Sequence, residues 1–297
     1  MGRIWKYVIA TRPWSFSMSV ISVSVGTLLA AEKGPVLWGW FALTAIGMVL
    51  FHGAANVVND YFDVRYKVDQ PDSPTAKYRP HPLLSGMLTP RQLLAEVIFL
   101  YALTLAIGLV LTFERSPLLL LIGFIGFLVS LFYTAGPVRY KYRALGELAV
   151  FLVWGPLVVQ GAYAVQRQTL SVKALYVSIP FGVLVALVLL ANNMRDIQYD
   201  SRQGIKTLSI LVGRSWSVRL YGVLIASAYL FLAGMVADGL LSPWGLLVFL
   251  SAPRAVTLLR SFNRSIPEDA DAVTAQVDTL FGLLLIATLV LNKVIPL

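Results

Sequence analysis

Nine long apolar stretches constrain the fold of this chain more than any other feature of its sequence. A helix needs about 17–25 mostly apolar residues to cross the hydrocarbon core of a bilayer. Only 13% of the residues are charged, whereas soluble domains carry about 25%. The sequence therefore predicts an all-α, polytopic membrane protein with nine transmembrane helices. They are expected at Trp14–Ala31, Val36–Asn59, Leu93–Phe113, Pro117–Thr134, Leu145–Val165, Val172–Met194, Trp216–Val236, Pro243–Leu259 and Thr274–Val294.

The basic residues are distributed unevenly about these helices. Only Lys33, Arg115, Arg167, Lys173 and Lys293 fall on one side of the predicted membrane, and the other Lys and Arg residues fall on the N-terminal side. Basic loops tend to stay in the cytoplasm. We therefore expect a protein integral to the cell membrane, with its N-terminus and its long polar loops in the cytoplasm. Membrane orientation then explains the net charge of +9, and no nucleic-acid partner is expected.

Cysteine is absent, and His52 and His81 are the two histidines. This composition excludes disulfides, thiolate nucleophiles and cysteine-ligated zinc or iron–sulfur sites. A bound metal would have to be a hard cation held by carboxylate and amide oxygens. His52 can either tune a proton in a pocket or be a buried core residue, and the second interpretation is favoured. His81 lies between two prolines and is expected in a loop.

A first cluster of acidic and amide side chains closes the second apolar stretch. Asn56, Asp60 and Asp63 are spaced i, i+4 and i+7, and Asp69 follows them. If the helix continues through this segment, the first three side chains share one face. The cluster would then lie where the helix leaves the membrane, on its basic side.

A second cluster closes the sixth apolar stretch on the same side of the membrane. Asn192, Asp196 and Asp200 are spaced i, i+4 and i+8 and also share a helix face. Like charges on one face repel each other, so both clusters need a compensating cation. Mg²⁺ prefers oxygen ligands and commonly bridges carboxylates to phosphate oxygens. A single acidic residue at a helix end is usually just solvated, but the repetition favours a magnesium–diphosphate site.

Cationic side chains on the same side are candidates to hold a diphosphate, because a leaving diphosphate develops negative charge. The Gly136-Pro137 break would direct Arg139 and Lys141 towards a shared centre. The alternative for each cation is a plain membrane anchor. The candidates are Arg12, Arg65, Lys67, Arg79, Arg139, Lys141, Arg195, Arg202 and Lys206.

The two clusters stand four helices apart. This spacing suggests a duplicated four-helix unit, residues 1–143 and 144–260, followed by a ninth helix within 261–297. All of these parts would belong to a single transmembrane domain, residues 1–297.

The combined motifs resemble those of the UbiA superfamily of intramembrane prenyltransferases. The resemblance rests on Asn56-x-x-Asn59-Asp60-x-x-Asp63 together with Asp196-x-x-x-Asp200, and it covers most of the chain. Further segments are similar to the MenA-like branch, which prenylates 1,4-dihydroxy-2-naphthoate for menaquinone. These are the loop 79–86, the segments 133–137 and 145–147, and the stretch 192–208. Many relatives carry an Asp where this chain has Lys67, and here Asp69 takes that place as in MenA-like members.

The resemblance implies a UbiA-type helical bundle and Mg²⁺-dependent transfer of a prenyl group from a polyprenyl diphosphate to a lipophilic aromatic acceptor. Tyr133 and Lys141 would act at the catalytic centre with the acidic clusters. The implied partners are the two substrates and membrane lipid. Metal and diphosphate would be held by Asn56, Asp60, Asp63, Asp69, Asp196 and Asp200. Further substrate contacts would come from Arg12, Arg65, Arg139, Asn192 and Lys206.

Three alternatives remain at this point. The acceptor could be 4-hydroxybenzoate, homogentisate, a porphyrin-type ring or geranylgeranylglyceryl phosphate. An ion-coupled transporter would also hold carboxylates in a bundle, but usually near the bilayer midplane on broken helices. A lipid phosphotransferase of the CDP-alcohol type would need an Asp-Gly…Ala-Arg signature, which this sequence lacks.

Overall fold

The computed structural model describes residues 2 and 4–296, and this part of the chain contains helices, turns and loops but no strands. Eight helices are long and apolar enough to cross a membrane, and α6 (Leu118–Thr134) is a shorter apolar helix. The prediction of an integral membrane protein with nine helices is therefore confirmed within the precision of such a count. The eight are η1–α2–η2 (Pro13–Lys33), α3 (Trp38–Arg65), α5 (Pro90–Glu114), α7–η4–α8 (Gly146–Arg167), α9 (Val172–Arg202), α11 (Arg214–Ala237), η5–α12 (Pro243–Arg264) and α13 (Ala270–Val294).

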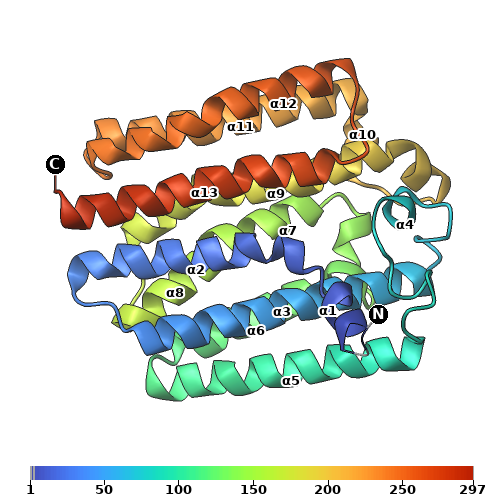
Figure 1. The fold of residues 1–297 in the computed structure, drawn as a ribbon, viewed down its shortest axis with the longest axis horizontal. Coiled ribbons are helices and arrows are strands. Elements are labelled where there is room, and N and C mark those ends of the chain that lie inside the picture. The colour runs from blue at the N-terminus through green and yellow to red at the C-terminus, as the bar shows by residue number, and fades with distance from the viewer. Residues whose placement is uncertain (1, 3, 297) are drawn as a thin grey trace.

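The long helices run nearly side by side, and the two chain ends lie at opposite ends of the bundle (Figure 1). α11 and α12 form one edge in this view, α5 forms the other, and α2, α9 and α13 lie between them. Short elements occupy the end where the loops are longest: α1 (Trp5–Ala10), α4 (Pro74–Tyr78), η3 (Tyr140–Tyr142) and α10 (Leu208–Val212). We call this end, with the loops 66–89, 135–145 and 203–213, the loop-rich end.

Small residues let the central helices approach closely. A Cβ added at Gly26 of α2 would lie 2.3 Å from the carbonyl oxygen of Val159 in α8. A Cβ added at Gly182 of α9 would lie 2.8 Å from the Cα of Gly155. Because lipid is as apolar as the helix surfaces, close packing of this kind supplies much of the association energy in membranes.

A π-helical turn, η4 (Val153–Leu157), interrupts the fifth crossing. Pro156 cannot donate a backbone hydrogen bond, which disturbs the regular α-helical pattern here. Ser22 Oγ of α2 donates to the carbonyl oxygen of Trp154 over 2.6 Å, so this carbonyl stays satisfied inside the bundle. Such bulges frequently lie at functional sites, and this one directs Val153 and Trp154 into a cavity.

The helices that carry the two acidic clusters are longer than predicted. The second and sixth stretches were expected to end at Asn59 and Met194, but α3 continues to Arg65 and α9 to Arg202. Hydropathy falls where charged residues begin, whereas the backbone hydrogen bonds of the helix do not depend on side-chain polarity. Both clusters therefore lie on continuous helices. The proposed division into two four-helix repeats stays a prediction.

Candidate active site

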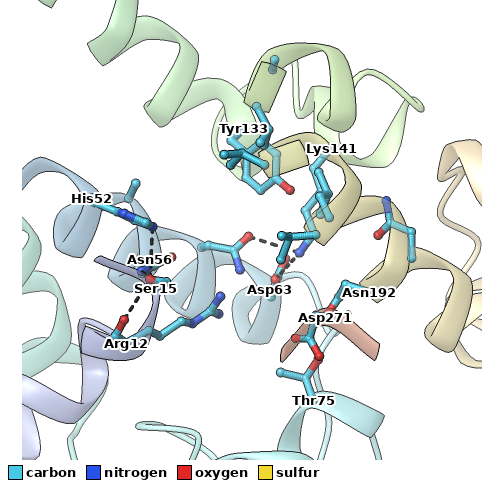
Figure 2. A pocket seen from close by; sticks show the side chains of 18 of the residues that line it. Arg12, Ser15, His52, Asn56, Asp63, Thr75, Tyr133, Lys141, Asn192 and Asp271 are labelled. Carbon is cyan, nitrogen blue, oxygen red and sulfur yellow. Dashed lines mark hydrogen bonds and ion pairs between the residues drawn. The ribbon is translucent and has the colours of Figure 1, made fainter. Parts of the chain in front are cut away.

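A cavity of about 280 Å³ lies at the loop-rich end. Helices α2, α3, α6, α7, α9 and α13 contribute to its walls, together with loop residues (Figure 2). Its polar lining includes side chains of both predicted clusters. Apolar and aromatic side chains line the rest, among them Met18, Phe51, Val153, Trp154 and Leu189.

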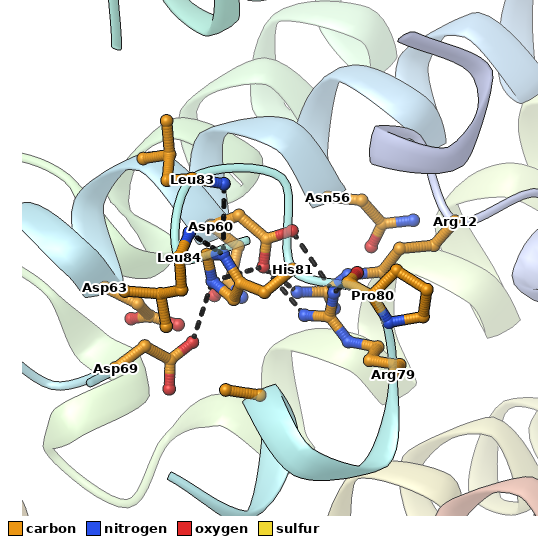
Figure 3. A network of polar contacts seen from close by, with 12 residues as sticks. Arg12, Asn56, Asp60, Asp63, Asp69, Arg79, Pro80, His81, Leu83 and Leu84 are labelled. Carbon is orange, nitrogen blue, oxygen red and sulfur yellow. Dashed lines mark hydrogen bonds and ion pairs between the residues drawn. The ribbon is translucent and has the colours of Figure 1, made fainter. Parts of the chain in front are cut away.

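Asp60 is the most buried member of the first cluster, with no exposed surface. The guanidinium of Arg12 forms an ion pair with Asp60 Oδ1, and Arg79 Nη2 lies 2.8 Å from the same oxygen (Figure 3). Arg79 Nη1 also donates to Asp60 Oδ2 over 3.4 Å. Two cations from different loops therefore converge on one carboxylate of α3.

Asp63, one turn further along α3, has a separate pair of donors. Lys141 Nζ lies 2.6 Å from Asp63 Oδ2 and 3.1 Å from Asn59 Oδ1, and Tyr142 donates its hydroxyl proton to Asp63 Oδ1. Burial alone would lower the pKa of Lys141, but the charges of Asp63 and Asp69 outweigh it and raise that pKa. Lys141 is therefore a largely buried side chain that remains a charged ammonium at neutral pH.

Asp69 reaches this site because the chain reverses at Lys67, which has a left-handed φ of 60°. The carbonyl oxygen of Asp63 accepts the backbone N–H of Val68 at 2.8 Å and that of Asp69 at 3.1 Å. Asp69 Oδ2 lies 3.4 Å from His81 Nε2, which also lies 3.7 Å from Asp60 Oδ1. The turn thus places Asp69 beside the helical carboxylates, as its predicted role requires.

His81 is in a loop, as expected, but only 2% of its surface is exposed. Its Nδ1 accepts the backbone N–H groups of Leu83 at 3.3 Å and Leu84 at 3.4 Å. A neutral imidazole with Nδ1 as acceptor carries its proton on Nε2, which faces Asp60 and Asp69. His81 Nε2 therefore lies between the two carboxylates but makes no hydrogen bond to either of them.

The second cluster is organised by Arg195, which adjoins Asp196 on α9. Arg195 Nε lies 2.7 Å from Asp196 Oδ1, Nη2 lies 2.7 Å from Asn192 Oδ1, and Nη1 lies 2.9 Å from Asp271 Oδ1 of α13. Asp200 lines the same cavity one turn further on. In this cluster one guanidinium, that of Arg195, therefore pairs with both Asp196 and Asp271, whereas Asp200 has no ion pair among the described residues.

The loop that follows α3 contacts the C-terminal end of α9 and the residue after it, and these contacts hold the two clusters on one cavity. Tyr199 donates its hydroxyl proton to the carbonyl oxygen of Val68 over 3.1 Å. Gln70 Nε2 donates to Gln203 Oε1 over 3.3 Å. These contacts come from residues about 130 positions apart in the chain, so the expected meeting of the two helix ends is a property of the fold.

The predicted site residues divide into three groups by position. Asp60 is buried under its guanidinium partners behind the cavity wall. Three predicted substrate contacts lie at the surface instead: Arg65 near the hydroxyl of Tyr61, Arg139 over the ring of Tyr66, and Lys206 beside Arg143. The residues that line the cavity are Arg12, Asn56, Asp63, Asp69, Tyr133, Lys141, Asn192, Asp196 and Asp200.

Several residues with direct contacts to the site were outside the predicted set. Arg79 and Arg195 belonged to the wider list of cations, and they reach the cavity where Arg65 and Arg139 do not. A usable signal existed for both, since Arg79 opens the proline-rich loop and Arg195 adjoins Asp196. Tyr142 and Asp271 carried no signal, because a tyrosine after Lys141 and an acid at a helix start are common patterns.

The donor set fits a hard divalent cation. The acidic clusters offer carboxylate and amide oxygens, which are the ligands that Mg²⁺ prefers. One oxygen each of Asp60 and Asp69 and one nitrogen of His81 lie within 4.8 Å of one another. Alternating carboxylates and fixed cations line one cavity, which suits a ligand that combines phosphate oxygens with metal ions.

Comparison with known proteins places this architecture in a family. Residues 19–290 match the model of the UbiA prenyltransferase family. The chain is 31% identical to 1,4-dihydroxy-2-naphthoate octaprenyltransferase of Bacillus subtilis, over 96% of this chain and 91% of that protein. It is 34% identical to human UbiA prenyltransferase domain-containing protein 1, over 97% and 86% of the two chains.

Solved structures agree in fold. The apo structure of a UbiA homolog from Aeropyrum pernix aligns with a TM-score of 0.73 at 18% identity, over 94% of this chain and 98% of that one. A UbiA homolog from Archaeoglobus fulgidus, bound to GPP and Mg²⁺, aligns with a TM-score of 0.66 at 16% identity, over 96% and 99%. The fold is thus that of the intramembrane prenyltransferases. The chain belongs to the UbiA prenyltransferase family.

Proposed function

We propose that this enzyme transfers a prenyl group from a polyprenyl diphosphate to 1,4-dihydroxy-2-naphthoate, in a reaction that depends on Mg²⁺. The observation that supports this most directly is that two oxygen-rich clusters, on α3 and α9, line one cavity with an apolar and aromatic inner part. A charged head and an apolar acceptor need these two environments side by side. The naphthoate acceptor is favoured by the 31% identity to the Bacillus subtilis octaprenyltransferase.

The polar part of the cavity would hold the diphosphate. The carboxylates of Asp63, Asp69, Asp196 and Asp200 and the amides of Asn56 and Asn192 line the cavity and would hold Mg²⁺. Asp60 lies behind the wall and would join them through its group with Asp69 and His81. Bound there, Mg²⁺ would neutralise charge that develops on the leaving group. Four cations of the chain add to this neutralisation: Arg12, Arg79, Lys141 and Arg195. Because they are already held in place, they stabilise departing charge without reorganising. Loss of diphosphate would leave an allylic cation, which the electron-rich acceptor ring would attack to form the new C–C bond. The attacked ring carbon would then lose a proton, or a carboxyl group as CO₂, to restore aromaticity.

A second cavity of about 560 Å³ would accept the prenyl tail. Apolar side chains of α3, α5, α6 and α8 line it, and Phe51, Gly126 and Val153 line both cavities. The two spaces are therefore neighbours with a common wall. A tail that leaves lipid for this groove gains little hydrophobic energy, since both are apolar, so most of the affinity must come from the charged head.

The cavity would face the cytoplasm, because the loop-rich end carries most of the basic residues. The absence of cysteine allows a clean test, in which single cysteines are introduced at exposed positions in opposite loops. Lys77→Cys should react with a membrane-impermeant thiol reagent only when the cells have been permeabilised, so that the reagent can enter the cytoplasm. Glu114→Cys should react in intact cells. The reverse pattern would overturn the orientation.

The activity itself is tested with purified protein, a labelled prenyl diphosphate, Mg²⁺ and separate acceptors. We expect prenylated product with 1,4-dihydroxy-2-naphthoate and much less with 4-hydroxybenzoate or geranylgeranylglyceryl phosphate. Product with one of the other acceptors alone would keep the enzyme class and overturn the acceptor. No product with any acceptor, and no release of diphosphate, would overturn the proposed reaction.

A further inference from the structure

A chain of hydrogen bonds runs from the aromatic part of the cavity to the backbone turn at Arg12. Trp154 Nε1 lies 3.1 Å from Ser19 Oγ, which lies 2.9 Å from His52 Nδ1. On the other side of the ring, His52 Nε2 lies 3.2 Å from Ser15 Oγ, whose hydroxyl donates to the carbonyl oxygen of Arg12 over 2.8 Å. The hydrogen bonds from His52 through Ser15 to Arg12 are visible in Figure 2.

The direction of each bond follows from its end groups. An indole N–H can only donate, so Ser19 Oγ accepts from Trp154 and gives its own proton to His52 Nδ1. A neutral imidazole that accepts at Nδ1 carries its proton on Nε2, which then donates to Ser15 Oγ. Every donor in the chain has one acceptor, and the ring nitrogens of His52 have opposite roles.

The ring of His52 cannot easily turn away from these partners. Only 5% of the residue is exposed. Its ring centroid lies 4.9 Å from that of Trp154 and 5.6 Å from that of Phe16, both in edge contacts. The packing therefore fixes which nitrogen faces which serine.

The turn at the end of this chain is an uncommon one. Arg12 has φ 56° and ψ 62°, a left-handed conformation that side chains with a Cβ rarely adopt. Ser15 holds the Arg12 carbonyl, and Asn56 Nδ2 donates to the carbonyl oxygen of Thr11 over 2.9 Å and to Ser15 Oγ over 3.2 Å. The turn directs the Arg12 guanidinium to Asp60, while Arg12 Nε is buried without a hydrogen-bond partner among the described residues.

We propose that His52 is a positioning residue for the diphosphate site: as a neutral imidazole it fixes Ser15, and through Ser15 the left-handed turn that aims Arg12 into the cavity. This inference rests on the proposed function, because it assigns Arg12 to the diphosphate. The positioning role proposed for His52 differs from a core-packing role in the property that a substitution would change. A packing histidine would affect the stability of the whole bundle, whereas a positioning histidine affects anion binding through Arg12.

The test measures binding of inorganic pyrophosphate in the presence of Mg²⁺ to the purified full-length protein by calorimetry. His52→Phe keeps a ring of similar size and removes both hydrogen bonds, so we expect affinity to fall about tenfold. His52→Gln retains one donor and one acceptor and should stay within about threefold of the wild type. In an Arg12→Ala background, His52→Phe should change affinity less than about twofold, because the two residues act through one contact.

Two further variants complete the design. Tyr229→Phe removes another buried hydrogen bond, from Tyr229 to Ser251 at 2.7 Å, far from the cavity, and should leave pyrophosphate affinity unchanged. Ser15→Ala should weaken binding as His52→Phe does, and it carries the test if the phenylalanine variant does not fold. Thermal unfolding of each variant identifies losses that come from misfolding.

The outcomes separate the inference from the function it rests on. Equal pyrophosphate affinity in wild type, His52→Phe and Ser15→Ala would overturn the positioning role and leave the proposed function intact. Independent, multiplicative losses from His52→Phe and Arg12→Ala would overturn it as well. No pyrophosphate binding by the wild type would overturn the proposed function, and the inference would fall with it.

Discussion

Replacement of Lys141 tests the charge balance of the site most sharply. Its ammonium lies 2.6 Å from Asp63 Oδ2, and the side chains of Lys141 and Asp63 are 16% and 2% exposed. Removal of one partner of a buried ion pair costs about 3–5 kcal/mol, because the other charge is left without compensation. We expect Lys141→Met to lower the free energy of unfolding by about 3 kcal/mol, the lower end of this range, since Tyr142 still donates to Asp63.

A second substitution distinguishes the effect of leaving Asp63 without its charged partner from the effect of losing the Lys141 side chain itself. Asp63→Asn combined with Lys141→Met removes both charges, and we expect it to recover about half of the lost stability or more. Neither variant should regain prenyl transfer, because both lack groups that would hold the diphosphate. Stability and activity thus move independently in this cycle, which a general packing defect would not produce.

The pH dependence has a definite sign. The folded pKa of Lys141 is raised above its usual value of 10.5 by Asp63 and Asp69, despite burial. A raised pKa in the folded state means that the contribution is fully present below 10.5 and is lost only as the pH rises through the folded pKa. The stability difference between wild type and Lys141→Met should therefore be constant between about pH 7 and pH 9.

Thermal unfolding in detergent, followed by tryptophan fluorescence, measures these changes. A loss of about 3 kcal/mol corresponds to a fall in Tm of about 6–12 °C. Lys77→Met serves as the control, because Lys77 is an exposed lysine at the same end of the bundle, and its Tm should not change. Wild-type stability in Lys141→Met, or a double variant less stable than the single one, would refute the reasoning.

Three other predictions follow from the site and its cavities. Asp60→Ala and Asp196→Ala should each reduce prenyl transfer by at least about a hundredfold in protein that still elutes as a folded species; near-normal turnover in both would contradict the metal–diphosphate site. Chelation of divalent ions should stop turnover, and added Mg²⁺ should restore it; turnover that survives chelation would remove the metal from the reaction. Gly126→Leu should narrow the space where the two cavities adjoin and should shift the enzyme's substrate preference to shorter prenyl diphosphates. The substitution can be made without a backbone clash, since a Cβ at this position would lie 3.6 Å from Leu157. Gly234→Leu on α11, which lines neither cavity, should keep the wild-type preference.

Hydropathy and helical spacing were sufficient to predict the bundle and the two acidic helix faces. Both signals are local: a membrane helix satisfies its own backbone hydrogen bonds, and side chains at i and i+4 share a face in any helix. The meeting of Asp63 with Asp196 on one cavity was an inference from repetition. It holds because the loop after α3 contacts the C-terminal end of α9 and the residue after it.

The identity of the cations could not be predicted in the same way. Arg65 and Arg79 follow the same cluster, and a positive side chain on this side of the membrane is explained equally well as an anchor. Arg65 ends α3 on its exposed face, whereas the loop after α4 folds back and inserts Arg79 against Asp60. Loop conformation decides between them, and it depends on contacts that no local pattern encodes.

Buried polar networks were the other feature beyond sequence reasoning. His52 was expected to be a core residue and His81 a loop residue, and both descriptions are correct as far as they go. Their roles depend on partners 33–37 positions away for His52 and on the backbone of the next turn for His81. The left-handed turn at Lys67, which brings Asp69 to the site, likewise carries no glycine to signal it.

A structure of the enzyme with Mg²⁺ and an unreactive prenyl thiodiphosphate tests the central claim most directly. We predict density for the diphosphate between the carboxylates of α3 and those of α9, in contact with Arg12 and Lys141, with the prenyl chain directed past Phe51. Density for the diphosphate against one cluster alone, or outside this cavity, would contradict the account.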